Sequence, residues 1–403
     1  MKIENKKVLV TGGAGFIGSN LVDRLLEQNN TVICLDNFAT GKRENLANAL
    51  QHPAFTLIEG DIRNYEDCQK AVEGCNFVLH QAALGSVPRS IADPMTSTDV
   101  NIGGFVKMLH AAKEANVKRF VYAASSSTYG DHPDLPKVEH KIGNALSPYA
   151  ITKYVDELFA KNFSDIYGIE TIGLRYFNVF GRRQDPNGAY AAVIPLFVKK
   201  LMAHESPRIN GDGSYSRDFT YIENVIQANQ LAAITPTEAI KQKQVDYYTQ
   251  INTKNFSSKN ENSAFSPLEE GRCQRKECVG LTEGSVEQDK QKKEAVWQNN
   301  QGEAVKELEA KSLQPATLSE VFNVAFGERT SLNQLAQILK DNLARFDPAI
   351  ADVQFKYGDT RQGDVPHSLA SIEKGNTLLG YQPEYSVKKG LFEACDWYWK
   401  NLK

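Results

Sequence analysis

The sequence predicts an α/β fold, a Rossmann-type doubly wound parallel sheet followed by a smaller C-terminal α/β domain. Three observations support this prediction. Short apolar, β-rich runs alternate with longer amphipathic runs in the first half of the chain, a glycine-rich turn follows the first run, and beyond Gly181 the alternation loosens into loops and fewer helices. Such alternation is typical of βαβ units, whose helices cover both faces of a parallel sheet.

The first predicted strand is KVLVTG, and the helix GSNLVDRLLEQ follows it. The strands TVICLD, FTLIEGD and FVLHQAA come next, then the amphipathic helix NIGGFVKMLHAAKEA and the strand RFVYAASSS. A strand over 171–176 follows, and AVIPLFVKKLMA and YIENVIQANQLAAI are predicted helices. The chain ends in a predicted helix that carries Leu391, Phe392, Trp399 and Leu402.

A further helix is predicted in the segment SPYAITKYVDELFAKNF. Ser147 is a good N-cap residue, and Pro148 suits the first helical position, where its missing N–H is not needed. An apolar stripe through Tyr154, Leu158 and Phe159 supports the same prediction.

The composition changes between about residues 236 and 316, where Lys, Gln, Glu, Asn and Ser dominate and aliphatic residues are few. Such a segment buries little apolar surface, so we interpret it as a polar surface insertion, partly unstructured, with a solvated helix near 286–311. The predicted domains are residues 1–180, with later contributions from about 218–232 and 319–326, and residues 181–403, which contain the insertion.

Charge and cysteine content exclude several classes of protein. The 46 Lys and Arg residues against 49 Asp and Glu leave a formal charge of −3, so nucleic-acid binding is not expected. The six cysteines are scattered, and Cys273 and Cys278 lack a second Cys/His pair, which favours reduced thiols and predicts no metal site. With no signal-peptide pattern and no apolar run of about 18 residues, we expect a cytoplasmic protein that does not enter a membrane.

The segment VLVTGGAGFIGSN places Gly12, Gly15 and Gly18 between the first strand and the first helix. Such a turn lets the backbone approach a pyrophosphate and directs a helix N-terminus toward its charge. The second strand ends at Asp36, 18 residues after Gly18, where a carboxylate can bind adenosine ribose hydroxyls and would repel a 2′-phosphate. This order of elements predicts an NAD-binding first domain and favours NAD over NADP.

Tyr149 and Lys153 lie four residues apart and would share one face of the predicted helix. An unperturbed phenol has a pKa of about 10, and a cation held beside it favours the phenolate. Taken alone, the pair is compatible with an acid–base device and with ordinary surface residues, because aromatic and basic neighbours are common on helices.

Four motifs together resemble the extended short-chain dehydrogenase/reductase family: TGGAGFIG, AASSSTYG, the Tyr149-x-x-x-Lys153 pair and YFNVFG. Within that family the sequence is most similar to NAD-dependent nucleotide-sugar 4-epimerases, especially the UDP-N-acetylglucosamine 4-epimerases of bacterial surface-polysaccharide pathways. The resemblance covers about residues 6–232 and resumes from about 319 to the end, and HQAALGSVPRS, NGDGSYSRDFTYIENV and RQGDVPHSLA contribute to it.

The resemblance implies roles for individual residues. Tyr149 would be the acid–base catalyst, Lys153 would bind the nicotinamide ribose and lower the pKa of the tyrosine, and Ser125 would hydrogen-bond the sugar 4-hydroxyl. The implied cofactor contacts are Gly12, Gly15, Phe16, Ile17, Gly18, Asp36, Asn37, Asp61, Ile62, Gln81, Lys153 and Tyr176. The implied substrate contacts are Ser86, Arg89, Ser125, Ser126, Ser127, Asn178, Ala192, Arg217, Arg361, Asp364 and Ser368.

Among these substrate contacts, Arg217 and Arg361 would hold the diphosphate, Asp364 a ribose and Asn178 the nucleotide. Arg89 is a weaker candidate near the sugar and is equally compatible with a solvated surface charge. The resemblance also implies a homodimer that pairs through helices near 97–115 and 148–165.

The implied activity is interconversion of UDP-GlcNAc and UDP-GalNAc, or of their uronic acids, through a 4-keto sugar. Ser368, four residues after Asp364, would leave room for an N-acetyl group, although Pro366 stands where the subgroup often carries arginine. Dehydratases of this family carry an Asp-Glu pair where this chain has Ser126 and Ser127. A UDP-glucuronate decarboxylase is the enzymatic alternative, and an NAD-binding sensor or scaffold, supported only by the insertion, is the non-enzymatic one.

Overall fold

The structure is a computed structural model that describes residues 1–187, 192–261, 317–360 and 366–402. The chain divides into two compact units, one formed by Met1–Lys243 with Thr317–Lys403 and the other by Gln244–Ala316. The helix predicted near 286–311 lies outside the described residues.

A seven-stranded sheet forms the centre of the first unit, with every paired strand parallel, in the order β11-β6-β5-β4-β1-β2-β3. Its strands are β1 (Lys7–Thr11), β2 (Thr31–Asp36), β3 (Phe55–Glu59), β4 (Phe77–His80), β5 (Arg119–Ser125), β6 (Glu170–Tyr176) and β11 (Ser319–Val324). The predicted parallel sheet and its six N-terminal strands are therefore confirmed.

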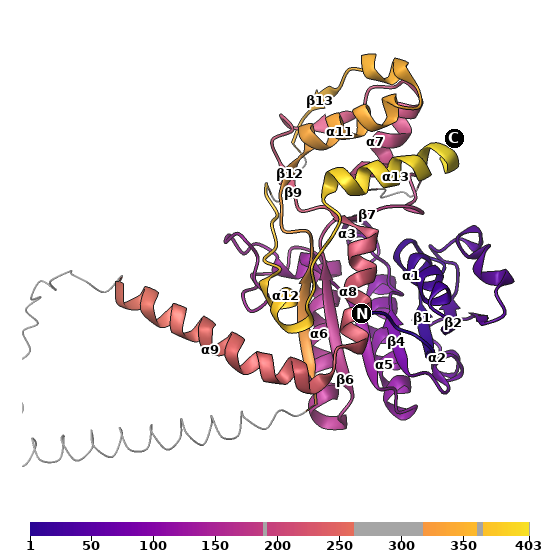
Figure 1. Cartoon of the computed structure of the whole chain (residues 1–403), viewed down its shortest axis with the longest axis vertical. Coiled ribbons are helices and arrows are strands. Elements are labelled where there is room, and N and C mark those ends of the chain that lie inside the picture. Colours follow the sequence, from indigo (N-terminus) through magenta and orange to yellow (C-terminus); the bar gives the residue numbers. More distant parts are fainter. Residues whose placement is uncertain (188–191, 262–316, 361–365, 403) are drawn as a thin grey trace, which may run out of the picture. The chain divides into compact units, whose positions relative to one another are not determined.

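Helices surround this sheet and join its strands (Figure 1). The described helices are α1 (Phe16–Glu27), α2 (Tyr65–Val72), α3 (Val87–Ala92), α4 (Pro94–Thr98), the π-helix η3 (Asp99–Gly104), α5 (Phe105–Glu114), α6 (Pro148–Tyr167), α7 (Val193–Met202), α8 (Ile222–Ile234), α9 (Thr237–Glu261), α11 (Leu332–Ala344), α12 (Glu373–Leu379) and α13 (Val387–Asn401). Short 3-10 helices are η1 (Arg43–Leu46), η2 (Ala49–Gln51), η4 (Ser126–Tyr129) and η5 (Pro348–Asp352).

Both faces of the sheet are covered. Leu9 and Phe120 point into a core cluster that α2, α5 and α6 complete, for example through Phe163. Val8 and Val10 are equally buried but lie outside this cluster. Because successive side chains of a strand point to opposite faces, the central strands are apolar on both sides, as in doubly wound sheets.

The later part of the chain builds a smaller assembly in which α7, α11 and α13 lie together (Figure 1). Three short strand pairs accompany them: β7 (Val179–Phe180) with β10 (Thr220–Tyr221), β8 (Arg208–Asn210) with β13 (Lys356–Gly358), and β9 (Ser216–Arg217) with β12 (Thr330–Ser331). The predicted helices α7, α8 and α13 are confirmed. Helix α11 was not predicted, although Ser331 and Gln334 form a capping box that marks its start.

Helix α6 begins as predicted, with the Ser147 hydroxyl accepting the N–H of Ala150 at 3.1 Å and a proline in the first turn. Of its predicted apolar stripe, however, only Phe159 packs against the core cluster, because Tyr154 and Leu158 are 37% and 52% exposed. The face that packs inward includes Lys153 and Phe163. Periodicity identifies an apolar stripe but not the element that covers it, which explains the difference.

The polar insertion starts as a regular helix, α9, whose residues up to Lys243, about two turns, belong to the first unit. Ile240 is fully buried, and the Thr237 hydroxyl donates to the Glu170 carboxylate at the start of β6. The next residue of β6, Thr171, pairs with Ser319 in β11, where the described chain resumes. The chain therefore leaves and rejoins this unit beside neighbouring strands.

We predict that replacing residues 244–316 by a short Gly/Ser linker leaves a folded first unit. The removed residues form a separate unit, and a shorter connection costs less loop-closure entropy. Thermal unfolding should stay cooperative, with a midpoint no lower than that of the full chain. Ile240→Ala in the shortened chain should, in contrast, lower the free energy of unfolding by about 2–5 kcal/mol. Aggregation of the shortened parent would contradict the prediction.

Candidate active site

The glycine turn after β1 leaves no room for a side chain at Gly12 or Gly18. Gly12 has φ +66°, and a Cβ atom there would lie 2.8 Å from the backbone of Ala82, while a Cβ at Gly18 would lie 2.1 Å from the Gly12 carbonyl oxygen. Helix α1 starts directly after Gly15 with no side chain capping its N-terminus. Backbone N–H groups and the positive end of the helix dipole thus meet at a bare surface that suits an anion.

Asp36 ends β2 beside this turn. Its carboxylate accepts the backbone N–H groups of Ala14 and Phe38, both at 2.8 Å, which fixes its orientation. Burial raises the pKa of Asp36, and the two N–H bonds oppose that effect. A carboxylate has about four lone-pair sites, so two N–H bonds leave acceptor capacity for hydroxyl groups.

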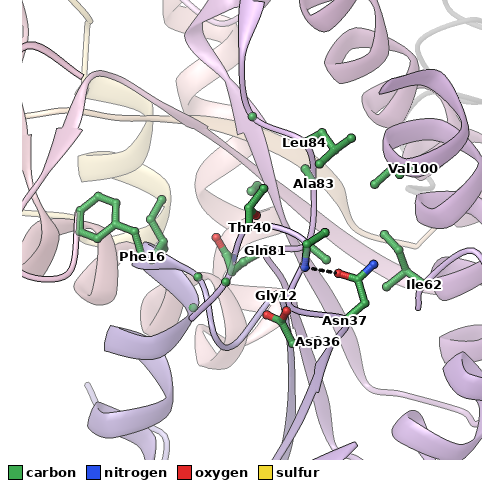
Figure 2. Close-up of a pocket in the computed structure, with 18 of the residues that line it drawn as sticks. Gly12, Phe16, Asp36, Asn37, Thr40, Ile62, Gln81, Ala83, Leu84 and Val100 are labelled. Carbon is green, nitrogen blue, oxygen red and sulfur yellow. Dashed lines mark hydrogen bonds between the residues drawn. The ribbon is translucent and has the colours of Figure 1, made fainter. Parts of the chain in front are cut away.

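A polar cluster at the end of β3 adds a second part of the same wall. Asn37 donates to Asp61 at 2.9 Å, and Arg63 binds Asp61 through its side chain at 2.7 Å. The Arg63 hydrogen bonds hold the pKa of Asp61 near about 2, so this carboxylate is ionised at neutral pH. Figure 2 shows Asp36 and Asn37 close to the glycine turn, with Phe16 toward one end of the cavity and Ile62 and Val100 toward the other.

Two side-chain amides and one phenol form a ring of hydrogen bonds at the wall of the cavity. Tyr176 donates to the Gln81 side-chain oxygen at 3.1 Å, Gln81 donates to Asn229 at 3.2 Å, and Asn229 donates to the Tyr176 oxygen at 2.9 Å. Burial raises the pKa of Tyr176 to about 12, so its hydroxyl remains a donor. Asn229 was missed in the sequence, because it lies on α8 without a motif of its own.

All twelve predicted cofactor contacts line one cavity of about 430 Å³, which we call the glycine-turn cavity. They come from the ends of β1, β2, β4 and β6, from the segment after β3, and from α1 and α6. Ser125 and Tyr149 line the same cavity. Residues from all parts of the N-terminal half thus meet at the carboxyl edge of the sheet, where doubly wound folds bind ligands.

Tyr149 and Lys153 stand one turn apart at the start of α6, and both face this cavity. Lys153 is 2% exposed and contacts the Asp156 carboxylate at 3.2 Å. Burial raises the pKa of Asp156, and the Lys153 charge opposes that effect. Asp156 was also missed, although its i+3 spacing from Lys153 was a signal.

Two buried polar residues, His80 and Ser90, support the part of the fold that carries Tyr149 and Lys153. His80 is fully enclosed, and burial together with the Lys153 charge lowers its pKa to about 3, so its imidazole is neutral and bonds Thr11 at 2.9 Å. The backbone N–H of Tyr149 donates to the buried Ser90 hydroxyl at 3.0 Å, which anchors the start of α6 to α3.

Ser125 ends β5, and its hydroxyl oxygen accepts both the N–H and the hydroxyl of Ser127, at 3.1 and 2.9 Å. These bonds use the oxygen as an acceptor, so the Ser125 O–H remains a donor toward a third group. The serine run thereby holds the Ser125 hydroxyl in a defined position at the edge of the glycine-turn cavity.

A second cavity of about 680 Å³ opens on the other side of Ser125, and we call it the serine cavity. Six predicted substrate contacts line it: Ser125, Ser126, Ser127, Asn178, Arg217 and Ser368. Ser125 and Asn178 also line the glycine-turn cavity, so the two cavities share a border. Both volumes fall in the usual range of small-molecule sites, about 300–1,000 Å³.

The segment around Ser368 is tied to β9. The Ser368 N–H donates to the Ser216 carbonyl at 3.0 Å, and Ser216 bonds the His367 ring at 2.9 Å. Arg217 donates to the carbonyl of Pro366 at 3.1 Å, so this proline takes part in positioning the arginine.

Three predicted substrate contacts, Ser86, Arg89 and Ala192, are not among the residues that line these cavities. Ser86 caps α3 by accepting the Arg89 N–H at 3.2 Å, and neither residue is among those lining the two cavities. Ala192 is the exposed residue before α7. Arg361 and Asp364 lie outside the described residues.

Within the described ranges, no group of three or more His, Cys, Asp and Glu side chains is arranged to hold a metal ion. Cys34, Cys68, Cys75 and Cys395 are buried free thiols, and Cys273 and Cys278 lie outside those ranges. None of the described helices combines the length and apolar character needed to span a membrane.

Comparison with known proteins gives a consistent family. The model of the NAD dependent epimerase/dehydratase family matches residues 8–246. A putative UDP-glucose 4-epimerase of Methanocaldococcus jannaschii is 31% identical over 392 residues, which cover 97% of each chain. A UDP-glucuronate 4-epimerase of Thermodesulfobacterium geofontis is 32% identical over 403 residues, covering 98% of this chain and 97% of the relative.

Solved structures agree. The UDP-N-acetylglucosamine 4-epimerase of Methanobrevibacter ruminantium, in complex with UDP-N-acetylmuramic acid, is 32% identical with a TM-score of 0.73 and 99% coverage of both chains. The UDP-glucose 4-epimerase of Thermotoga maritima, with UDP-glucose, is 28% identical with a TM-score of 0.71, covering 98% of this chain and all of the other.

Proposed function

Because this chain belongs to the NAD-dependent epimerase/dehydratase family, we propose that it is a 4-epimerase of UDP-N-acetylglucosamine and UDP-N-acetylgalactosamine, or of their uronic acids. The coarser conclusion, a UDP-sugar 4-epimerase that uses NAD, follows from the family and its relatives. The observation that carries the proposal is the position of Ser125. It lines both cavities, and it shares the glycine-turn cavity with Tyr149 and Lys153.

The walls of the glycine-turn cavity fit NAD. The bare turn at Gly12 and the uncapped start of α1 suit its pyrophosphate, and Asp36 retains acceptor capacity for ribose hydroxyls. When bound, NAD supplies the acceptor and then the donor of the hydride at the sugar C4. We assign Lys153 to the nicotinamide ribose and the ring of Gln81, Tyr176 and Asn229 to shaping the neighbouring wall.

The chain's own groups control the proton and the position of the sugar. We assign Tyr149 to removing the proton of the 4-hydroxyl and returning it after inversion. The Ser125 O–H would hydrogen-bond the same oxygen. Arg217 would hold the diphosphate with charge-assisted hydrogen bonds while the 4-keto sugar turns its other face toward the cofactor.

Product analysis of the purified protein tests this function. The wild type should interconvert UDP-GlcNAc and UDP-GalNAc without added NAD. Tyr149→Phe should lower kcat by at least about 100-fold while UDP-sugar binding persists, since only the ionisable hydroxyl is lost. Tyr357→Phe, at a 57% exposed tyrosine in β13 that lines neither cavity, is the matched control and should change kcat little.

The outcomes separate the alternatives. Release of CO₂ from UDP-glucuronate would favour a decarboxylase, and absence of turnover on any UDP-sugar would favour an NAD-binding sensor. Activity of Tyr149→Phe within a few-fold of wild type would refute the role given to this tyrosine.

We propose that Ser368 sets the preference for acetylated sugars. It lines the serine cavity, and its N–H is bound to the carbonyl of Ser216, so a larger side chain at this position would be held in the cavity. Ser368→Tyr should lower kcat/KM for UDP-GlcNAc by roughly 10- to 200-fold while sparing UDP-glucose, because overfilling excludes the bulkier C2 substituent. Equal loss on both sugars, or a wild type that prefers UDP-glucose, would refute this assignment.

We propose that the enzyme is a homodimer through the outer face of α6. Ile151, Leu158 and Ile166 are 51%, 52% and 62% exposed on this helix, and Ile91 and Met95, on the adjacent α3–α4 segment, are 63% and 80% exposed. Clustered apolar exposure of this kind is typical of an interface, and a two-fold axis would bury the same face on both chains.

Light scattering tests the dimer. The wild type should have twice the chain mass of 44.8 kDa, and Leu158→Asp should shift it toward the monomer. Leu50→Asp, at a 44% exposed leucine in η2, is the control and should stay dimeric. A monomeric wild type at assay concentration would contradict the proposal.

A further inference from the structure

One buried cation in the serine cavity differs from the others in its partners. Five lysine and arginine side chains are buried in the described part of the chain: Arg119, Lys137, Lys153, Arg175 and Lys374. Four of them contact a carboxylate: Arg119 binds Glu170, Lys153 binds Asp156, Arg175 binds Glu157 and Lys374 binds Glu320. Among the described residues, Lys137 has no carboxylate within ion-pair distance.

Lys137 is 6% exposed and lines the serine cavity. Its ammonium group donates to the backbone carbonyl of His132, which uses one of its three N–H bonds. Burial lowers the pKa of Lys137, and the exposed Asp134 opposes this only at a distance. A buried ammonium without an anion costs free energy, so an anion that enters the cavity would be stabilised there.

The location of the ammonium indicates which part of a ligand it meets. His132 donates its N–H to the carbonyl of Tyr129, the last residue of η4, and η4 begins with the serine run at Ser126. Lys137 is therefore held at the serine end of the cavity, whereas Arg217 is held by Ser216 and Pro366. The two charged groups are held by different residues, the Lys137 ammonium by His132 and the Arg217 guanidinium by Ser216 and Pro366. We therefore assign the diphosphate to Arg217 and a separate anion to Lys137.

We propose that Lys137 is a specificity-determining residue that binds a carboxylate carried by the sugar of the substrate, so that the site accepts UDP-hexuronates. This inference rests on the proposed function, because it takes the serine cavity as the sugar site. Backbone contacts keep the lysine in place: its N–H donates to Leu369 at 2.7 Å, and its carbonyl accepts from Ser371 at 2.9 Å. The segment that carries Ser368 thus also anchors Lys137. This one region would therefore contact both the C2 substituent and the C6 carboxylate of the sugar ring.

The test is calorimetric binding of UDP-glucuronate, UDP-glucose and UDP to the purified holoenzyme. UDP-glucuronate and UDP-glucose differ only at C6, so their comparison isolates the carboxylate. The wild type should bind UDP-glucuronate more tightly than UDP-glucose. Lys137→Met removes the charge at similar length and should raise the Kd of UDP-glucuronate by about 10- to 100-fold, the range for a lost charged hydrogen bond. Its Kd for UDP-glucose and UDP should stay within about three-fold.

Lys141→Met is the matched control, since Lys141 is an exposed lysine near Asp134 in the same loop, and it should leave all three Kd values unchanged. A wild type that binds UDP-glucose as tightly as UDP-glucuronate would overturn the proposal without any variant, even if Lys137→Met failed to fold. A similar loss for all three ligands in Lys137→Met would also overturn it, by assigning the lysine to the diphosphate or to structure alone.

Turnover of the same UDP-sugars separates this inference from the epimerase proposal. A protein that binds UDP-glucuronate through Lys137 but inverts no sugar would refute the epimerase function and leave the carboxylate site standing. A protein that inverts neutral UDP-sugars and binds UDP-glucuronate no better than UDP-glucose would refute the carboxylate site and leave the epimerase function standing.

Discussion

In-register parallel pairing of the central strands is the constraint on which the rest of the site depends. Thr11 pairs with His80, and Ser125 pairs with Tyr176. Parallel strands end at the same edge of a sheet, so the glycine turn, Gln81, the serine run and Tyr176 arrive together although the chain separates them widely. A shift of one residue in any of these strands would turn its terminal side chain to the opposite face.

Helix α6 is locked to that edge by buried charge. Arg175, next to Tyr176 in β6, binds Glu157 through two hydrogen bonds of 2.8 and 2.7 Å, both ends being almost fully buried. One residue earlier on the helix, Asp156 contacts Lys153. Breaking such pairs by removing one partner leaves an uncompensated buried charge, which is strongly destabilising. The same helix turns that hold α6 on the sheet therefore also hold Lys153 in position.

The residues that we propose for catalysis and those that we propose for substrate choice lie on different elements of the fold. Ser125 and Tyr149 stand on β5 and α6, which belong to the rigid sheet layer. Arg217, Lys137 and Ser368 stand on short strands and loops that are tied together by backbone hydrogen bonds. Loops positioned by a rigid scaffold tolerate change more readily than core elements. In the proposed enzyme, the residues that contact the C2 and C6 substituents could thus change without moving Ser125 and Tyr149, which we assign to the 4-hydroxyl.

The sequence by itself determined the six N-terminal strands, the glycine turn, Asp36 at the end of β2 and the start of α6. Each of these depends on periodicity or spacing within a few tens of residues, and the chain encodes such features locally. Only the tertiary structure decided that Asn229 closes a ring with Gln81 and Tyr176, and that Leu158 faces outward. It also decided that Lys137 is buried without a carboxylate among the described residues. These properties belong to side chains brought together from distant segments by packing, for which no local pattern carries a signal.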